Sequence, residues 1–235
     1  MKLLVLAGGF GTRLQSALSN VPKALAPVCG TPFLRLQLEN WIGQGIDEII
    51  FLLHHQADQI ILFLHLQRKI FLKECDINWV VESTPMDTGG AIANAVKTLN
   101  LRGEFLVINA DTWLSTGMVE LARSISPSIG LVYLENISRY GQVKYDKDFH
   151  IVKFSEKAVT SMPGWINAGI FHLDPLFFLD WNGKPFSLES HLFVELAQSR
   201  QLHAVQLNTD FLDIGIPADY KRFCRWVHEG RKLPL

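Results

Sequence analysis

The first residues of the chain with an evident chemical use form a loop after a short apolar run. Residues 3–6 have the composition of a buried strand, and the glycine-rich stretch Gly8-Gly9-Phe10-Gly11-Thr12 follows them. Glycine has no Cβ, so backbone N–H groups in such a loop can close around phosphate oxygens. Arg13 and Lys23 follow the loop and would neutralise phosphate charge. Together these residues predict a site that binds a nucleoside triphosphate.

Two common phosphate-binding loops do not match this stretch. The Rossmann fingerprint G-x-G-x-x-G needs a third Gly or Ala for close packing of helix on strand, and Leu14 stands at that position. The Walker A loop needs Lys followed by Ser or Thr after its glycines, which this loop lacks. The sequence therefore disfavours both a dehydrogenase and a P-loop enzyme.

Composition points to a globular protein without a nucleic-acid or membrane partner. The 235 residues suffice for one large domain, 48% of them are apolar, and the net charge is near −1. So small a charge supplies no basic field for nucleic acid or for a membrane surface. No apolar stretch reaches about twenty residues, and the N-terminal run is too short for a signal segment. Three dispersed cysteines suit free thiols in a reducing cytoplasm rather than disulfides or a zinc site.

The first half of the chain alternates strand and helix patterns. Strands are expected at 2–6, 48–53, 77–81 and 105–109, and helices at 31–44, 57–70 and 89–99. Thr31 is expected to cap the first of these helices, with Pro32 at its first position. This order predicts an α/β fold of the Rossmann-like, three-layer α/β/α kind with a mostly parallel mixed sheet. Ligands of such folds bind at the carboxyl ends of the strands.

The second half changes rhythm. Short strands at 129–134, 142–145, 151–154 and 166–172 predict a mixed or antiparallel extension over the cleft. A short helix after Asp174-Pro175, a helix at 187–199 capped by Ser187, strands at 205–207 and 211–214, and a closing helix at 217–229 complete the expectation. No linker interrupts the chain, so one domain over 1–235 is expected. No hexapeptide repeats follow residue 215, so no C-terminal β-helix is expected.

Further polar residues stand where the strands are expected to end. Glu82 opens a segment that continues through Thr88 and Gly89 into a helix, and Asp111 and Asp213 follow two other strands. Taken singly, such residues cap helices and turns, and Glu156-Lys157 taken alone is a solvated surface pair. At the carboxyl ends of neighbouring strands, however, polar side chains are expected to face a ligand.

Taken together, these motifs closely resemble those of the sugar-1-phosphate nucleotidylyltransferases. The five motifs are GGxGTRL with a downstream Pro-Lys, the segment 82–92, Ala-Asp at 110–111, Glu-Lys at 156–157 with Asn-x-Gly at 167–169, and F-x-D-I-G-I-P at 211–217. They stand in the family's order from residue 3 to about residue 220. The short form resembles most the D-glycero-α-D-manno-heptose-1-phosphate guanylyltransferases. It is also similar to uridylyltransferases acting on N-acetylmuramate 1-phosphate and to mannose-1-phosphate guanylyltransferases.

The resemblance implies the fold of nucleotide-diphospho-sugar transferases, with a nucleotide-binding half at 1–112 and a sugar-phosphate-binding half at 113–220. It also implies a role for each matching residue. Nucleotide contacts are implied for Leu6, Ala7, Gly8, Gly9, Gly11, Thr12, Arg13, Lys23, Glu82, Thr88, Gly89 and Asn109, with Arg13 and Lys23 as the catalytic cations. Sugar-phosphate contacts are implied for Glu156, Lys157, Asn167 and Gly169, and Asp111 and Asp213 are implied as ligands of Mg²⁺.

Three segments depart from the family pattern. One is Ala158, which stands where Pro is usual after Glu156-Lys157, so that this turn is expected to be looser. Met86-Asp87 stands where Leu-Gly is common, which changes the expected shape of the base pocket. Ile216 replaces the usual Thr, so the last helix is expected to lose a side-chain cap, with more effect on stability than on chemistry.

The implied reaction is an in-line displacement at the α-phosphorus of an NTP by a sugar 1-phosphate, with release of pyrophosphate. GTP and D-glycero-D-manno-heptose 1-phosphate are the expected substrates, in the cytoplasm and for surface polysaccharide synthesis. Uridylyl-, cytidylyl- and mannose-1-phosphate guanylyltransferases of the same fold stay open as alternatives, as does a non-catalytic nucleotide-sugar-binding protein. A homodimer also stays open, because Trp165, Phe177, Phe178 and Trp181 could supply a patch, although core packing is their expected use.

Overall fold

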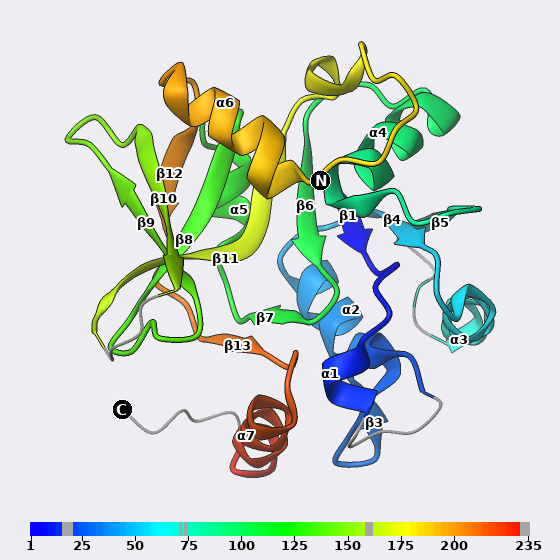
Figure 1. Ribbon diagram of the computed structural model, residues 1–235. Coiled ribbons are helices and arrows are strands. Elements are labelled where there is room, and N and C mark those ends of the chain that lie inside the picture. The colour runs from blue at the N-terminus through cyan, green and yellow to red at the C-terminus, as the bar shows by residue number, and fades with distance from the viewer. Residues whose placement is uncertain (16–20, 71, 73–74, 158–161, 231–235) are drawn as a thin grey trace.

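The computed structural model describes residues 1–15, 21–70, 72, 75–157 and 162–230 of the chain. Among these residues, the centre of the molecule is a nine-stranded sheet in the order β10-β9-β11-β6-β1-β4-β5, with β8 pairing with β11 and β12 (Figure 1). Its strands are β1 (Lys2–Leu6), β4 (Glu48–Leu53), β5 (Asp76–Val81), β6 (Phe105–Asn109), β8 (Ser128–Leu134), β9 (Gly141–Tyr145), β10 (Ile151–Lys157), β11 (Gly164–Leu173) and β12 (His203–Gln206).

The remaining elements surround this sheet. Two short ribbons pair β2 (Pro27–Val28) with β3 (Thr31–Pro32) and β7 (Thr112–Leu114) with β13 (Phe211–Asp213). The α-helices are α1 (Thr12–Gln15), α2 (Phe33–Gly43), α3 (Ala57–Ile70), α4 (Asp87–Leu99), α5 (Met118–Ala122), α6 (Phe193–Gln198) and α7 (Pro217–His228). Single helical turns are the 3₁₀ turns η1 (Lys23–Leu25) and η2 (Pro175–Phe178) and the π-helical turn η3 (Leu188–Leu192).

The strands β6, β1, β4 and β5 run parallel, which brings their carboxyl ends to one edge of the sheet. Leu6 at the end of β1 pairs with Leu52 of β4 and with Asn109 of β6. Strand β11 joins the other side of β6 in the antiparallel direction, with Ile170 opposite Ile108. The sheet is therefore continuous from the first half of the chain into the second, and the glycine loop begins at its centre.

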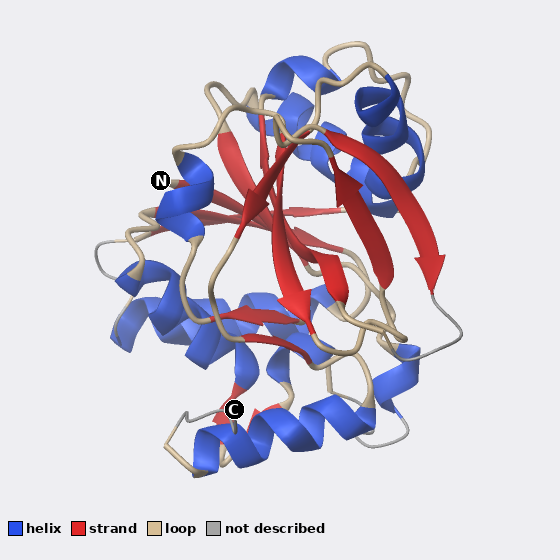
Figure 2. Ribbon diagram, turned by 90° about the vertical axis from the view of Figure 1, so that its left-hand side faces the viewer, coloured by secondary structure: helices blue, strands red, loops and turns tan. Residues whose placement is uncertain are grey.

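Apolar side chains cover both faces of the sheet. In β1, Leu3 and Val5 pack with α2, α3 and α5, whereas Leu4 packs with α4 and α6. Every second side chain of a strand points to the same face, so this apolar run supplies both cores. Figure 2 shows the resulting arrangement, with helices on both sides of the central strands. The predicted three-layer architecture is confirmed.

A third apolar cluster lies beside the sheet and includes side chains of α7, the last helix of the described chain. The aromatic rings of Phe33, Trp113, Phe223 and Trp226 contact one another there, with centroids 5.0–6.5 Å apart. These rings belong to α2, β7 and α7, so the cluster attaches α7 to the segment that follows β6. Leu14 of α1 is buried in the same cluster.

The predicted strands and long helices are confirmed within a few residues, including α4, which begins at Asp87, two residues before the predicted start, but two local predictions are wrong. Thr31 does not open α2, because Thr31 and Pro32 form β3 and the amide of Phe33 bonds to Ala26 at 2.9 Å. The N-cap of α2 is Pro32, which has no side-chain hydroxyl to offer. The predicted helix from Ser187 is a π-helical turn followed by α6, although Ser187 does cap it by accepting from the Ser190 amide.

The chain carries no membrane-spanning helix among its described residues, since none of those helices is both long and apolar enough. The aromatic residues that could have formed a surface patch serve the core. Phe178 is buried, and Trp165, Phe177 and Trp181 are partly buried against the cluster around α4 and α6.

Candidate active site

The glycine loop leaves β1 beside the end of β4. The amide of Ala7 bonds to the Leu52 carbonyl at 2.9 Å, and the Gly8 carbonyl accepts from the His55 amide at 3.4 Å. A Cβ on Gly8 would lie 3.2 Å from the Cβ of His54, so the loop passes β4 at a distance that favours glycine. Gly11 has a φ of +62°, which a residue without a side chain adopts at little cost. Helix α1 then begins at Thr12.

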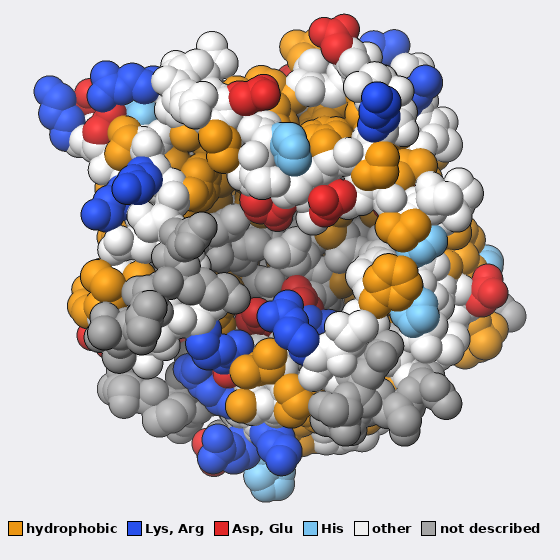
Figure 3. Space-filling model, in the orientation of Figure 1, with side chains coloured by type: hydrophobic (Ala, Val, Ile, Leu, Met, Phe, Trp, Pro, Cys, Tyr) orange, Lys and Arg blue, Asp and Glu red, His pale blue; other side chains and the backbone are white. Residues whose placement is uncertain are grey.

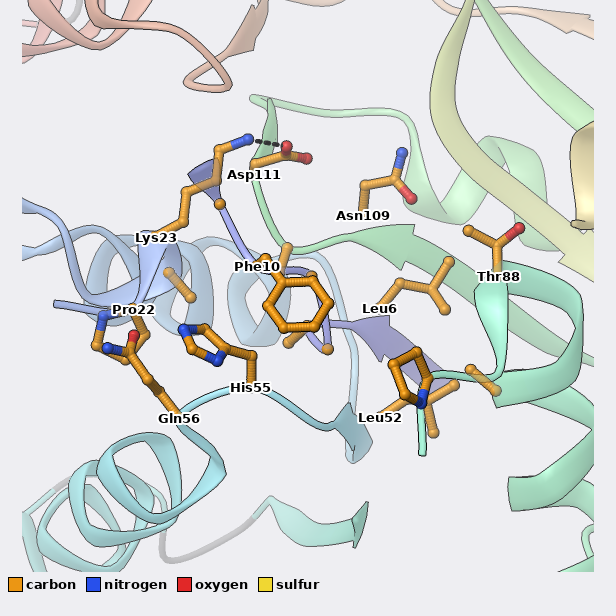
Figure 4. Close-up of a pocket in the computed structure, with 18 of the residues that line it drawn as sticks. Leu6, Phe10, Pro22, Lys23, Leu52, His55, Gln56, Thr88, Asn109 and Asp111 are labelled. Atoms are coloured by element: carbon orange, nitrogen blue, oxygen red, sulfur yellow. Dashed lines mark hydrogen bonds and ion pairs between the residues drawn. The ribbon is translucent and has the colours of Figure 1, made fainter. Parts of the chain in front are cut away.

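The loop borders a cavity of about 550 Å³ at the carboxyl ends of β1, β4 and β6. Most of the residues predicted to bind nucleotide line it, namely Leu6, Ala7, Gly8, Gly9, Gly11, Thr12, Arg13, Lys23, Glu82, Thr88 and Asn109. Asp111 lines it as well. Within the described part of the chain Gly89 lies outside this lining, and its amide donates to the Phe186 carbonyl at 2.9 Å. In Figure 4 the Lys23–Asp111 pair lies above Phe10, and Thr88 lies to the right, beyond Leu6.

The cationic end of the cavity is built around Lys23. The side chain of Lys23 is 16% exposed, and its Nζ atom forms an ion pair with Oδ2 of Asp111 (Figure 4). Asp213 is close to the same ammonium group, because a Cβ placed on Gly215 would lie 3.0 Å from Lys23 Nζ and 2.6 Å from Asp213 Oδ1. The two carboxylates predicted to share a cation therefore converge on one lysine.

A short ribbon brings these carboxylates together. Strand β13 pairs antiparallel with β7, so that Asp213 lies opposite Thr112, the neighbour of Asp111. Polar side chains of α2 hold the other side of β7, since Gln37 Nε2 donates to the Thr112 carbonyl at 2.9 Å and Asn40 Nδ2 donates to the Leu114 carbonyl at 2.7 Å. Asp111 is thus fixed by β6 before it and by this braced ribbon after it.

The electrostatics of the pair fit a divalent cation. Burial raises the pKa of Asp213, and the nearby Asp111 carboxylate raises it further, while Lys23 and the Gly215 amide oppose the rise. Within the described residues, no three His, Cys, Asp or Glu side chains gather into a metal site by themselves. Mg²⁺ is commonly held by one or two carboxylates that leave its other positions to water and phosphate. Asp111 and Asp213 supply such a donor set, and a cation would relieve their repulsion.

The opposite end of the cavity is walled by the segment before α4. Glu82 is buried, its Oε2 accepts from the Met86 amide at 3.1 Å, and burial raises its pKa. Asp87 has a φ of +60°, in the left-handed region that glycine adopts more readily, and its carboxylate accepts from the Thr88 amide at 2.9 Å. A left-handed backbone at this position suits the glycine that the family commonly has there.

The second half of the chain meets the first at the end of β6. Gly169, with a φ of +69°, passes so close that a Cβ on it would lie 2.7 Å from Asn109 Nδ2 and 3.0 Å from Thr112 Oγ1. The side chain of Asn167 accepts from the Gly169 amide at 2.8 Å and so holds this bend. The backbone of Glu156 and Lys157 belongs to β10, whereas their side chains, and all of Ala158, lie outside the described part of the structure.

Sequence reasoning missed several residues of the cavity wall. Phe10 is 50% exposed within the glycine loop, and its ring centroid lies 5.1 Å from that of His55, which also lines the cavity (Figure 4). Phe10 occupies the variable position of GGxGTRL, so the motif gave no signal for it. His55 was anticipated, because the pair His54-His55 after an apolar run indicates a strand end near a cleft. On the face shown in Figure 3, acidic and basic side chains lie near one another in the middle of the molecule.

Comparison with known proteins agrees with this geometry. The family model described as "Nucleotidyl transferase" matches residues 2–227. A D-glycero-alpha-D-manno-heptose 1-phosphate guanylyltransferase of Campylobacter jejuni is 32% identical over 95% of this chain and 98% of its own length. The catalytic subunit beta of Drosophila melanogaster mannose-1-phosphate guanylyltransferase is 30% identical, and the match spans 60% of its length and 93% of this chain.

Among solved structures, HddC from Yersinia pseudotuberculosis superposes with a TM-score of 0.84 at 32% identity, covering 96% of this chain and 99% of HddC. HddC has also been crystallised in complex with GMP-PN. The chain belongs to the nucleotidyl transferase family. Its fold and its relatives identify it as a sugar-1-phosphate nucleotidyltransferase.

Proposed function

We propose that this chain transfers a guanylyl group from GTP to D-glycero-D-manno-heptose 1-phosphate, giving GDP-heptose and pyrophosphate for surface polysaccharide synthesis. The observation that carries the proposal is the convergence of Lys23, Asp111 and Asp213 beside the glycine loop, where Lys23, Asp111 and Gly215 line the cavity. The choice of substrates is supported by relatives, because the guanylyltransferase that matches nearly end to end acts by its name on heptose 1-phosphate. We place the reaction in the cytoplasm, where nucleoside triphosphates are made.

The reaction joins two polyanions, so its main demand is positive charge. Two unit charges 4 Å apart repel by about 4 kcal/mol at an effective dielectric constant near 20, and several charges meet here. The backbone amides of the loop Gly8–Thr12 and the side chain of Arg13 hold the β- and γ-phosphates, and Lys23 contacts the α-phosphate. Asp111 and Asp213 would hold Mg²⁺, which when bound would neutralise phosphate charge.

The sugar phosphate is both acceptor and nucleophile. One of its phosphate oxygens forms a bond to the α-phosphorus while the bond from that phosphorus to the bridging oxygen breaks, and pyrophosphate leaves with the electron pair. The nucleophile is already an anion, so no strong general base is needed. Lys157 neutralises the acceptor phosphate, and Glu156, Asn167 and Gly169 orient the sugar. Holding both reactants in line supplies much of the acceleration.

A matrix of four NTPs against several sugar 1-phosphates, with Mg²⁺ and with pyrophosphate release as the signal, tests this function. GTP with the heptose 1-phosphate should give the highest kcat/KM. Mannose 1-phosphate is the second candidate acceptor, because the Drosophila relative is 30% identical. Highest turnover with UTP or CTP would overturn the guanylyl assignment. Binding of a nucleotide sugar without turnover of any pair would instead indicate a non-catalytic protein.

Two substitutions test the roles of the charged residues. Lys23→Ala and Asp111→Ala should each lower kcat by more than about 100-fold while the fold survives. The first removes a positive charge at the transferring phosphate, and the second removes a carboxylate that would hold Mg²⁺. Circular dichroism and thermal unfolding check the fold. Near-normal turnover in either variant rejects the assignment of that residue.

A further inference from the structure

A segment of the second half of the chain lies against the start of α4, which walls the nucleoside end of the cavity. The Phe186 carbonyl accepts from the amides of Gly89 at 2.9 Å and Gly90 at 3.1 Å, and the Phe186 amide donates to the Met86 carbonyl at 3.2 Å. Figure 1 shows this yellow segment, between β11 and α6, passing beside α4. Three backbone hydrogen bonds therefore join Phe186 to the segment 86–90.

Side chains add a second set of bonds at the same place. Thr88 Oγ1 donates to Glu189 Oε2 at 2.7 Å and accepts from the Leu188 amide at 2.8 Å. Ser187 Oγ donates to the same carboxylate oxygen at 3.1 Å. Among the described residues, Thr88 lines the cavity, whereas Ser187 and Glu189 do not. The wall residue Thr88 is thus held by partners from the other half of the chain.

The ring of Phe186 explains why residue 89 is glycine. A Cβ on Gly89 would overlap three atoms of that ring. Gly89 lies in the first turn of α4, and its φ is not in the left-handed region, so space rather than backbone conformation excludes a side chain. The sequence resemblance assigns Gly89 to the nucleotide. The structure fills the space in front of its Cα with Phe186 instead.

The turn that presents Phe186 is itself held by local bonds. Trp181 Nε1 donates to the Lys184 carbonyl at 2.8 Å, and the Lys184 amide donates to Asn182 Oδ1 at 3.0 Å. Trp181 is partly buried against the apolar cluster around α4. Phe186 is therefore anchored from the core side before it meets the segment 86–90.

We propose that Phe186 is a positioning residue for nucleotide binding, which acts by fixing the cavity wall formed by Met86, Asp87 and Thr88. The proposal rests on the proposed function insofar as the cavity takes a nucleoside triphosphate. The wall includes Asp87, whose positive φ is a conformation that an unsupported segment would leave. Without the ring and its neighbours, the wall occupies its binding-competent arrangement for a smaller fraction of time. The apparent nucleotide affinity falls in proportion to that fraction.

Truncation of the ring is the first test. Phe186→Ala should raise the Kd for the nucleotide, measured by calorimetry, by about 10-fold, as for a competent fraction reduced to a tenth. The KM for the sugar phosphate should stay within about twofold, and Phe186→Leu should restore most of the affinity. Phe193→Leu is the control, because Phe193 is buried in the same cluster but its ring contacts Phe154 and Phe171. The control should lower stability and leave the nucleotide Kd unchanged.

A second test asks whether the Phe186 ring or the bound nucleotide is the reason that residue 89 has no side chain. Gly89→Ala alone should weaken nucleotide binding and stability, because its methyl group collides with Phe186. The double variant Gly89→Ala/Phe186→Ala makes room for that methyl group. It should bind nucleotide as well as Phe186→Ala alone and should show favourable coupling in the free energy of unfolding. If the base itself needs the space, the double variant will be weaker than either single variant.

The role of Phe186 and the proposed function are overturned by different results. Wild-type protein that binds nucleotide but releases no pyrophosphate would overturn the function, while the Kd series would still decide the role of Phe186. An unchanged nucleotide Kd in Phe186→Ala, with only a lower unfolding temperature, would reduce Phe186 to a core residue and overturn the inference. Wild-type protein that binds no nucleotide would overturn both.

Discussion

The backbone amide of Ile214 donates a hydrogen bond of 3.0 Å to the carbonyl oxygen of Asp111. This bond extends the β7–β13 ribbon to the metal-binding candidates themselves, because Asp213 directly precedes Ile214. The two carboxylates come from segments far apart in the chain, yet their backbones are hydrogen-bonded neighbours. Lys23, from a third segment, completes the group by pairing with Asp111.

Neutralising Asp213 should raise stability in the absence of metal but lower activity. Its raised pKa shows that the folded protein without metal disfavours this charge, chiefly through burial and then through Asp111. Asp213→Asn keeps an oxygen for the Gly215 amide, which now bonds to Oδ1 at 2.5 Å. We expect a higher free energy of unfolding without metal, a weaker dependence of that energy on Mg²⁺, and a fall in kcat of more than about 100-fold. Urea unfolding with and without Mg²⁺ and a pyrophosphate assay measure the three. A variant less stable than wild type without metal would contradict the electrostatic account.

The hydrogen bonds that α2 donates to β7 should contribute to both stability and catalysis. Gln37→Ala removes the donor to the Thr112 carbonyl and leaves a buried acceptor unpaired, which costs about 1–3 kcal/mol of unfolding free energy. The kcat should fall as well, because Thr112 follows Asp111. Asn40→Ala is the matched control, since Asn40 braces the far end of β7 at Leu114. If the two variants lose the same activity, Gln37 does not act through the position of Asp111.

The uncapped start of α7 offers a stabilising change. Ile216 is the N-cap with φ −133° and ψ 157°, and no side-chain hydrogen bond caps this helix within the described part of the chain. Ile216→Thr should raise the free energy of unfolding by about 0.5–2 kcal/mol, because a hydroxyl can accept from a free amide of the first turn. Ile216→Val has a similar branched shape without the hydroxyl and serves as the control. Equal stability of the Thr and Val variants would exclude capping as the cause, and kcat should stay unchanged in both.

The buried Glu82 should give the protein a defined pH dependence. Burial raises its pKa above the ordinary 4.5, against the opposing effects of the Met86 amide and His54. The folded state therefore holds the proton more tightly than the unfolded state, so wild-type stability declines as pH rises from 4.5 through the raised pKa.

Glu82→Gln cannot ionise and should not share this decline. The difference in unfolding free energy between the variant and wild type should move in favour of the variant over that window and stay constant above it. Denaturant titrations at a series of pH values measure the difference. Parallel pH profiles for the two proteins would show that Glu82 does not carry the effect.

Local sequence was enough for the sheet and the loop. The continuous apolar run at residues 3–6 and the glycines after it follow rules that act over a few residues, and both the strand β1 and the cavity at its end agree with them. Predictions failed where a distant partner overrode a local preference. Thr31 has a good capping side chain, but hairpin pairing places it in β3 instead.

The sequence by itself determined which chemical groups are available: a glycine-rich loop, two cations and two carboxylates at the ends of strands. Only the tertiary structure decided that Asp111 pairs with Lys23 while Asp213 lies near the same ammonium group, and that Phe186 fills the space in front of Gly89. The physical reason is that periodicity and turn chemistry act between near neighbours in the chain. Packing and hydrogen bonds between segments about a hundred residues apart set the β7–β13 register and hold Phe186 against α4. No local sequence pattern contains that information.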